Sequence, residues 1–113
     1  METLIRAVWQ LMIRTRDLQI LQFEMTFYAV RSRDAAGLAE KQYKGLLDLY
    51  ERFLNSPKAG SAEAAKIRRL THFVVAGLDG ILVQELAYPD AKRSEESIDC
   101  LISAAQSIAR DKG

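Results

Sequence analysis

The chain has 113 residues, enough for one domain with one core, and its 49% apolar content excludes an intrinsically disordered chain. Its 16 basic and 15 acidic residues give a net charge of +1, so the sequence lacks the basic excess of a nucleic-acid-binding surface. The single cysteine, Cys100, excludes an intrachain disulfide and favours a reducing compartment.

The sequence also indicates a cytoplasmic protein. No uninterrupted apolar run reaches the roughly 18 residues of a membrane span. The first residues, Met-Glu-Thr-Leu-Ile-Arg, lack the layout of a signal peptide because acidic and basic residues interrupt the apolar stretch.

Apolar residues at helical spacing predict five helices, and no segment alternates as a strand would. The first helix spans about 2–14 and carries a single apolar stripe. The second spans about 18–33, with Asp17 as its expected cap. Because the second helix is apolar on two sides, we expect it to be buried on both and to run through the centre of the domain.

The third predicted helix spans about 34–55, with Asp34 as a plausible cap. Its apolar stripe lies opposite a charged side, so we expect it to pack once and face water once. Residues 56–61, Ser-Pro-Lys-Ala-Gly-Ser, form the clearest loop in the chain.

The fourth predicted helix begins at Ser61 and ends at Ala87 or Tyr88, before Pro89. A second loop is expected over 90–94, with Ser94 capping a fifth helix that reaches about residue 110. Because both loops are short, neighbouring helices should fold back antiparallel as a five-helix bundle.

The fourth helix is unusual because one of its sides is built from small residues. A core stripe is formed by Ile67, Leu70, Val74, Leu78 and Ile81. A second sector contains Phe73, Ala76, Gly77, Gly80, Gln84 and Ala87. A glycine inside a helix costs about 1 kcal/mol relative to alanine. Gly77 and Gly80 therefore need an offsetting gain, and the close approach of another helix would supply it.

Self-association through the last two helices is the interpretation that we favour. Two helices from each of two copies would form an intersubunit four-helix bundle around a two-fold axis. The predicted dimer interface comprises Phe73, Ala76, Gly77, Asp79, Gly80, Gln84, Ala87, Leu101, Ala105 and Ile108. Asp79, the one charge in an apolar run, is interpreted there as a residue that sets register, although it could instead reach into a ligand pocket. The alternative is a monomer whose glycines admit the second helix.

Two segments resemble a known family. Residues 70–86, LTHFVVAGLDGILVQEL, resemble the penultimate helix of TetR-family transcriptional repressors, in which an apolar run with Leu-Asp-Gly followed by Gln recurs. Residues 18–31, LQILQFEMTFYAVR, are similar to the central helix of that family's regulatory domain. The resemblance covers nearly the whole chain. It implies an all-α bundle of the TetR regulatory-domain type over residues 1–113, a single ligand-binding and dimerisation domain.

The resemblance does not extend to DNA binding. Members of the family begin with a three-helix domain containing a helix-turn-helix, and no segment here resembles it. The chain by itself is therefore expected not to bind an operator, and DNA would be a partner only through that other domain.

Catalysis is not supported by the sequence. His72 and Cys100 lie on different predicted helices, and neither belongs to a nucleophile motif. There is no Gly-rich phosphate loop and no metal-ligand spacing, so we expect no catalytic residues, no metal and no cofactor.

Ligand binding is suggested by aromatic and methionine side chains on the inward faces of four predicted helices. Most must form the core, but helical domains often keep an apolar cavity with a few polar groups. The predicted ligand-binding residues are Trp9, Met12, Phe23, Thr26, Phe27, Tyr28, Tyr50, Phe53 and His72. For His72, a place at the surface and a place in the cavity are equally open.

Two functions follow from these observations. The first is a regulatory domain of a TetR-like repressor, a homodimer that binds a small hydrophobic or aromatic effector. The second is a helical dimerisation or adaptor module without a ligand, which would have a filled core and no cavity.

Overall fold

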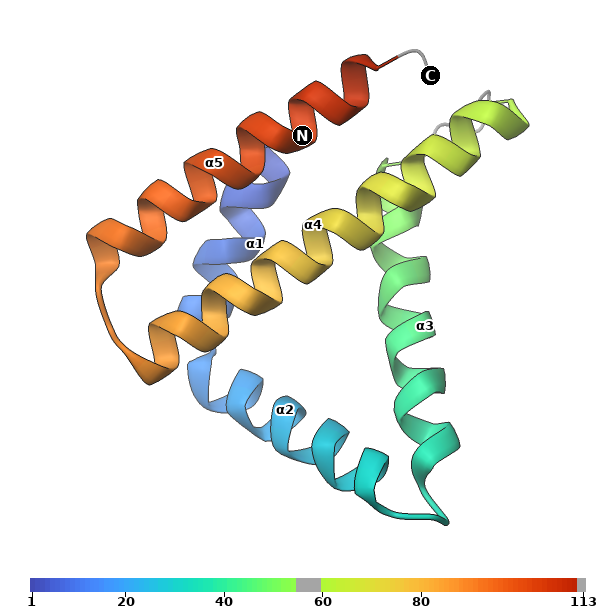
Figure 1. Ribbon diagram of the computed structural model, residues 1–113, viewed down its shortest axis with the longest axis vertical. Coiled ribbons are helices and arrows are strands. Elements are labelled where there is room, and N and C mark those ends of the chain that lie inside the picture. Colours follow the sequence, from blue (N-terminus) through green and yellow to red (C-terminus); the bar gives the residue numbers. More distant parts are fainter. Residues whose placement is uncertain (55–59, 112–113) are drawn as a thin grey trace.

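The computed structural model describes residues 1–54 and 60–111, and every regular element within them is an α-helix (Figure 1). The helices are α1 (Glu2–Arg14), α2 (Arg16–Arg31), α3 (Ala36–Leu54), α4 (Ser61–Ala87) and α5 (Ala91–Arg110). The predicted five-helix, all-α fold is confirmed. Asn55, predicted to end the third helix, and most of the loop predicted over 56–61 lie outside the described residues.

The break between α1 and α2 is a single residue, Thr15. Its hydroxyl donates to the carbonyl of Leu11 at 2.8 Å, and its backbone N–H bonds the same carbonyl at 3.0 Å. Because Thr15 occupies the N-cap position of α2, Asp17 lies in the first turn of that helix. The prediction that Asp17 caps α2 is therefore wrong by two residues.

The start of α5 also differs from the prediction. Asp90 is the N-cap, and its carboxylate accepts a hydrogen bond from the backbone N–H of Arg93 at 3.0 Å. Aspartate caps a helix as well as serine does, so the helix begins at Ala91 and the predicted loop over 90–94 is wrong. Ser94 is instead a buried residue inside α5, only 3% exposed.

Glu85 of α4 holds the first turn of α5 in place. One carboxylate oxygen, Oε2, accepts from the hydroxyl of Ser94 at 2.6 Å and from the backbone N–H of Asp90 at 3.0 Å. These two hydrogen bonds, that of Ser94 first, lower the pKa of Glu85. The α4–α5 turn is therefore fixed by a charged acceptor.

We expect Ser94→Ala to lower the free energy of unfolding by about 1 kcal/mol at neutral pH, because it removes one of these hydrogen bonds. A lowered pKa in the folded state means that this stabilisation is present above the ordinary carboxyl pKa of 4.5. It is lost as the pH falls through the lowered pKa of Glu85. Urea unfolding of both proteins should show a difference at pH 7 that shrinks in acid; a difference that is independent of pH would contradict the account.

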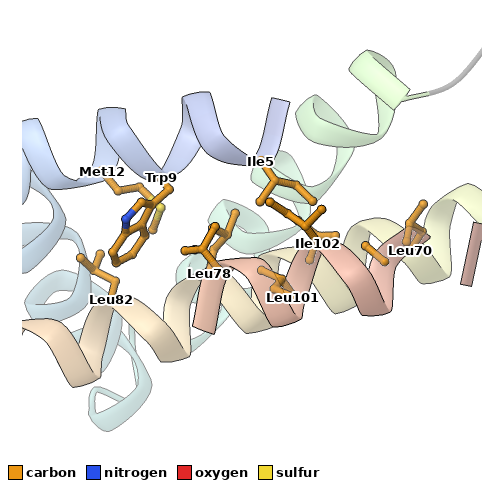
Figure 2. Close-up of a cluster of buried hydrophobic side chains, with 11 residues drawn as sticks. Ile5, Trp9, Met12, Leu70, Leu78, Leu82, Leu101 and Ile102 are labelled. Carbon is orange, nitrogen blue, oxygen red and sulfur yellow. The ribbon is translucent and has the colours of Figure 1, made fainter. Parts of the chain in front are cut away.

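The hydrophobic core lies where α1 and α5 pack against α4 (Figure 2). Side chains from α1, among them Ile5 and Trp9, lie against Leu78 and Leu82 of α4, and Ile102 of α5 closes the cluster. Leu82 is fully buried, and Ile5 and Trp9 are 2% and 3% exposed. Each such side chain contributes about 1.5–3 kcal/mol through burial, so this cluster is the main source of stability.

The helix at the centre of the domain is α4, and the prediction that the second helix is central is wrong. Helix α4 contacts α1, α3 and α5, whereas α2 contacts only α1 and α3 within the described chain. In α2 the one buried residue is Ala29. Six of its large apolar residues are 49–65% exposed, namely Leu18, Leu21, Met25, Phe27, Tyr28 and Val30. The contacts of α2 with α1 and α3 thus do not bury both of its apolar sides.

Helix α4 is also long and apolar enough, at 27 residues, to cross a membrane by length and composition. One such helix is weak evidence for a membrane span, because the core helix of a globular domain meets the same criterion. Three helices pack around α4, and this packing accounts for the apolar composition of its buried sides.

Candidate functional site

A cavity of about 660 Å³, partly open to solvent, lies between the first four helices. Helices α2 and α3 diverge from α4 to form a triangle, and α1 lies beside it (Figure 1). The walls are mostly apolar, with Leu11 from α1, Met25 from α2, Leu46 from α3 and Leu78 from α4 among them. This volume is within the usual range of ligand pockets, roughly 300–1,000 Å³.

Four of the predicted ligand-binding residues line this cavity: Met12, Phe23, Thr26 and Tyr50. They come from three helices, and Thr26 and Tyr50 bring hydroxyl groups to a mostly apolar surface. The structure therefore assembles part of the predicted set, and their binding of a ligand stays a prediction.

The other predicted ligand-binding residues lie elsewhere. Trp9 is packed in the core, 3% exposed. Phe27 and Tyr28 are 58% and 65% exposed and face a separate groove between α2 and the start of α3. His72 is exposed on α4 and lines none of the described pockets. The side chain of Phe53 lies outside the described part of the chain.

Tyr43 and Asp79 are two of the cavity residues outside the predicted ligand-binding set, and for Asp79 a place in a pocket was the alternative to the interface. The hydroxyl of Tyr43, on α3, donates a hydrogen bond to Oδ2 of Asp79, on α4. Asp79 therefore faces α3 and the cavity, and we do not retain its assignment to the dimer interface. The sequence held a signal for this: Asp79 follows Val75 by one helical turn, and Val75 also lines the cavity.

Burial sets the electrostatics of this group. It raises the pKa of Asp79, an effect that the hydrogen bond from Tyr43 partly opposes. Burial also raises the pKa of Tyr43, with the bond to Asp79 adding to it, and that of Tyr50, to which the charge of Asp79 contributes. The carboxyl group of Asp79 is thus partly removed from water and accepts a hydrogen bond from the phenol of Tyr43.

We expect Asp79→Asn to stabilise the fold at neutral pH, because the amide oxygen still accepts from Tyr43 while the desolvated charge is gone. The pKa of Asp79 is raised above its ordinary 3.8, so the folded chain binds the proton more tightly than the unfolded chain does. The stability of the wild type must then fall as the pH rises through this range.

Thermal unfolding between acid and neutral pH checks this expectation. The melting temperature of the variant should exceed that of the wild type near pH 7, and the gap should close below the ordinary carboxyl pKa. A gap that is constant with pH, or a less stable variant at pH 7, would count against the burial of the charge.

A second surface is the outer face of α4, which carries no charge over most of its length. Within the described helix, the exposed residues from 73 to 87 are Phe73, Ala76, Gly80, Val83, Gln84 and Ala87. Phe73 and Val83 are 38% and 48% exposed. Beside this face, α5 presents Cys100 and Ala104, and a shallow groove of about 490 Å³ runs between the two helices.

The two glycines of the small-residue sector have different surroundings. A Cβ on Gly77 would lie 2.5 Å from Cδ1 of Leu101, so Gly77 admits α5 of the same chain. A Cβ on Gly80 would meet nothing within 4 Å among the described residues. Packing within one chain therefore explains why a glycine occupies position 77. It gives no reason for the glycine at position 80.

The α5 residues predicted at the interface are used inside the chain. Leu101 and Ala105 are 6% and 0% exposed, and Ile108 is packed against the same core. These three face inward because α5 buries a stripe at helical spacing against α4. The surface left for a partner is the outer face of α4 together with Cys100 and Ala104.

Comparison with protein-family models gives one finding. Residues 1–106 match the family described as "Tetracyclin repressor-like, C-terminal domain". The match includes α1–α4 and most of α5. Neither the curated proteins nor the solved structures give a match.

Proposed function

Because the chain belongs to the family of tetracycline-repressor-like C-terminal domains, we propose that it is the effector-binding and dimerisation domain of a transcriptional regulator. Domains of this family generally dimerise and bind small-molecule effectors, and TetR-family regulators are soluble cytoplasmic proteins. The observation that carries the proposal is the cavity of about 660 Å³ between the first four helices. It favours this function over a dimerisation module with a filled core.

The effector is a small molecule with an apolar or aromatic body. Leucine, methionine and aromatic side chains form most of the cavity wall, and burying an apolar molecule against them contributes about 25 cal/mol per Å². The hydroxyls of Thr26 and Tyr50 are available to orient it. No catalytic chemistry is needed for this function.

Dimerisation uses the outer face of α4 with Cys100 and Ala104 of α5. Two copies meeting there about a two-fold axis would form a four-helix bundle from two α4 and two α5 helices. The absence of a side chain at Gly80 would allow two backbones to approach closely, which offsets the conformational cost of that glycine. Phe73 and Val83 would be removed from water.

Regulation follows from the two roles of α4. Val75, Leu78 and Asp79 line the cavity, while Ala76 and Gly80 lie on the outer face of the same helix. An effector that binds one position of α4 better than another would change how the two copies are arranged. In regulators of this family, that arrangement sets the spacing of two DNA-binding domains on their half-sites.

A thermal-shift screen of apolar and aromatic compounds tests the proposal. Compounds that bind should raise the melting temperature of the wild type, and calorimetry should show weaker binding to Tyr50→Ala. Phe27→Ala is the matched control, since it truncates an aromatic residue outside the cavity. If no compound stabilises the wild type, or if both variants lose binding equally, the cavity is not the effector site.

A further inference from the structure

We propose that the effector carries a positive charge, as a protonated amine on an aromatic body, and that the carboxylate of Asp79 binds it. This inference rests on the proposed function, since it identifies the class of ligand for the same cavity. Three features of the cavity support it: an unpaired carboxylate, the absence of a competing cation, and aromatic rings beside it.

The carboxylate of Asp79 has one oxygen free for a ligand. Tyr43 donates to Oδ2, and no described donor bonds Oδ1. Within residues 1–54 and 60–111 no ion pair includes Asp79. A partly buried carboxylate without a cation is costly, because it loses hydration and gains no opposite charge. A bound ammonium group would supply that charge.

Among the described residues that line the cavity, no cation competes for this position. Asp79 is the one formally charged group among the described residues that line the cavity. The remaining polar groups are the amides of Gln19, Gln22 and Gln42 and the hydroxyls of Thr26, Tyr43 and Tyr50. An anionic ligand would therefore find a like charge and no basic partner, whereas a cation finds the opposite charge.

Aromatic rings strengthen the preference for a cation. Phe23, Tyr43 and Tyr50 all line the cavity. The face of an aromatic ring attracts a cation at short range, and this attraction grows when water is excluded. The hydroxyl of Tyr43 donates a hydrogen bond to Asp79, so the lone pairs of the hydroxyl oxygen remain available to an ammonium group.

Three pyrene probes with a common body separate charge from apolar binding: 1-pyrenemethylamine, 1-pyrenemethanol and 1-pyrenecarboxylic acid. Fluorescence titration at neutral pH should give the wild type at least about a tenfold preference for the amine over the alcohol, with the acid weakest. In Asp79→Asn the affinity for the amine should fall to that for the alcohol, whose own affinity stays the same.

One further variant serves as a control. Asp48→Asn removes an exposed carboxylate of α3 that does not line the cavity, and it should keep the full preference. Loss of the preference in Asp48→Asn would mean that net charge alone attracts the amine, which overturns the role of Asp79.

The outcomes distinguish the two proposals. If the amine and the alcohol bind the wild type equally, or the acid binds most tightly, the effector is not selected by Asp79, while the effector-binding function stands. If none of the probes binds the wild type, and no compound in the thermal-shift screen raises its melting temperature, both proposals fail. A preference for the amine that persists in Asp79→Asn likewise overturns this inference.

Discussion

Gly45→Trp is expected to weaken effector binding by at least about a hundredfold, because the indole ring would occupy the space that a ligand needs. Gly45 lies on α3 and lines the cavity, and a Cβ added there meets nothing within 4 Å among the described residues. A side chain at this position therefore begins at the cavity wall in open space, and its Cβ makes no steric clash. Replacing a helical glycine also removes a conformational cost, so the fold should not lose stability.

Gly37→Trp is the matched control for this variant. Gly37 is also on α3, is also exposed and unobstructed, and does not line the cavity. Calorimetric titration with the strongest compound from the screen should show binding to Gly37→Trp and none to Gly45→Trp. Equal binding to both variants would place the effector outside the cavity.

Gly80→Leu is expected to convert a dimer into a folded monomer. Overpacking a tight contact costs about 1–3 kcal/mol. Because a two-fold axis places the substituted residue of both copies in the interface, this cost arises twice. The dimer should thus weaken by roughly 2–6 kcal/mol, at least about thirtyfold in its dissociation constant. Within one chain, the leucine meets nothing nearby and removes a helical glycine, so the melting temperature of the monomer should not fall.

Sedimentation equilibrium of wild type, Gly80→Leu and Gly37→Leu measures this directly. The wild type and Gly37→Leu should sediment as dimers, with twice the 12.7 kDa of one chain, and Gly80→Leu as a monomer. A wild type that is monomeric at micromolar concentration would contradict dimerisation. A dimer that persists in Gly80→Leu would exclude the outer face of α4 as its interface.

The sequence predicted best those helices that have one packing direction. In α1, the residues Ile5, Trp9 and Met12 repeat at helical spacing and all are buried on one side. The stripe of α5 behaves in the same way. In a helix with one apolar stripe, the period of the apolar residues indicates which face is buried, whichever neighbours cover it.

Helices with apolar residues on more than one side were harder to predict. Periodicity gives the angle of a residue around the helix but not which element lies in that direction. The two apolar sides of α2 therefore indicated burial on both, although Phe27 and Tyr28 are exposed and Met25 faces the cavity. Asp79 was similarly assigned to the dimer interface, because the sequence does not show that Tyr43 of α3 lies opposite it.

The cavity itself could be anticipated only in part. A residue that lines a cavity has the same composition and spacing as one that fills a core, and the difference lies in what is packed across from it. Trp9 and Met12 are neighbours on one face of α1, yet of the two only Met12 lines the cavity. Thr26 and Tyr50 were predicted because a hydroxyl on an inward face marks a place where polar contact is useful.

The central claim is that an effector binds in the cavity between the first four helices. Its most direct test is the map of backbone amide shifts when the strongest compound from the screen is titrated into the isotope-labelled chain. The largest shifts are predicted around the cavity, at Thr26, Tyr43, Tyr50 and Asp79. Saturable shifts confined to the groove beside Cys100, with the cavity residues unmoved, would contradict the claim.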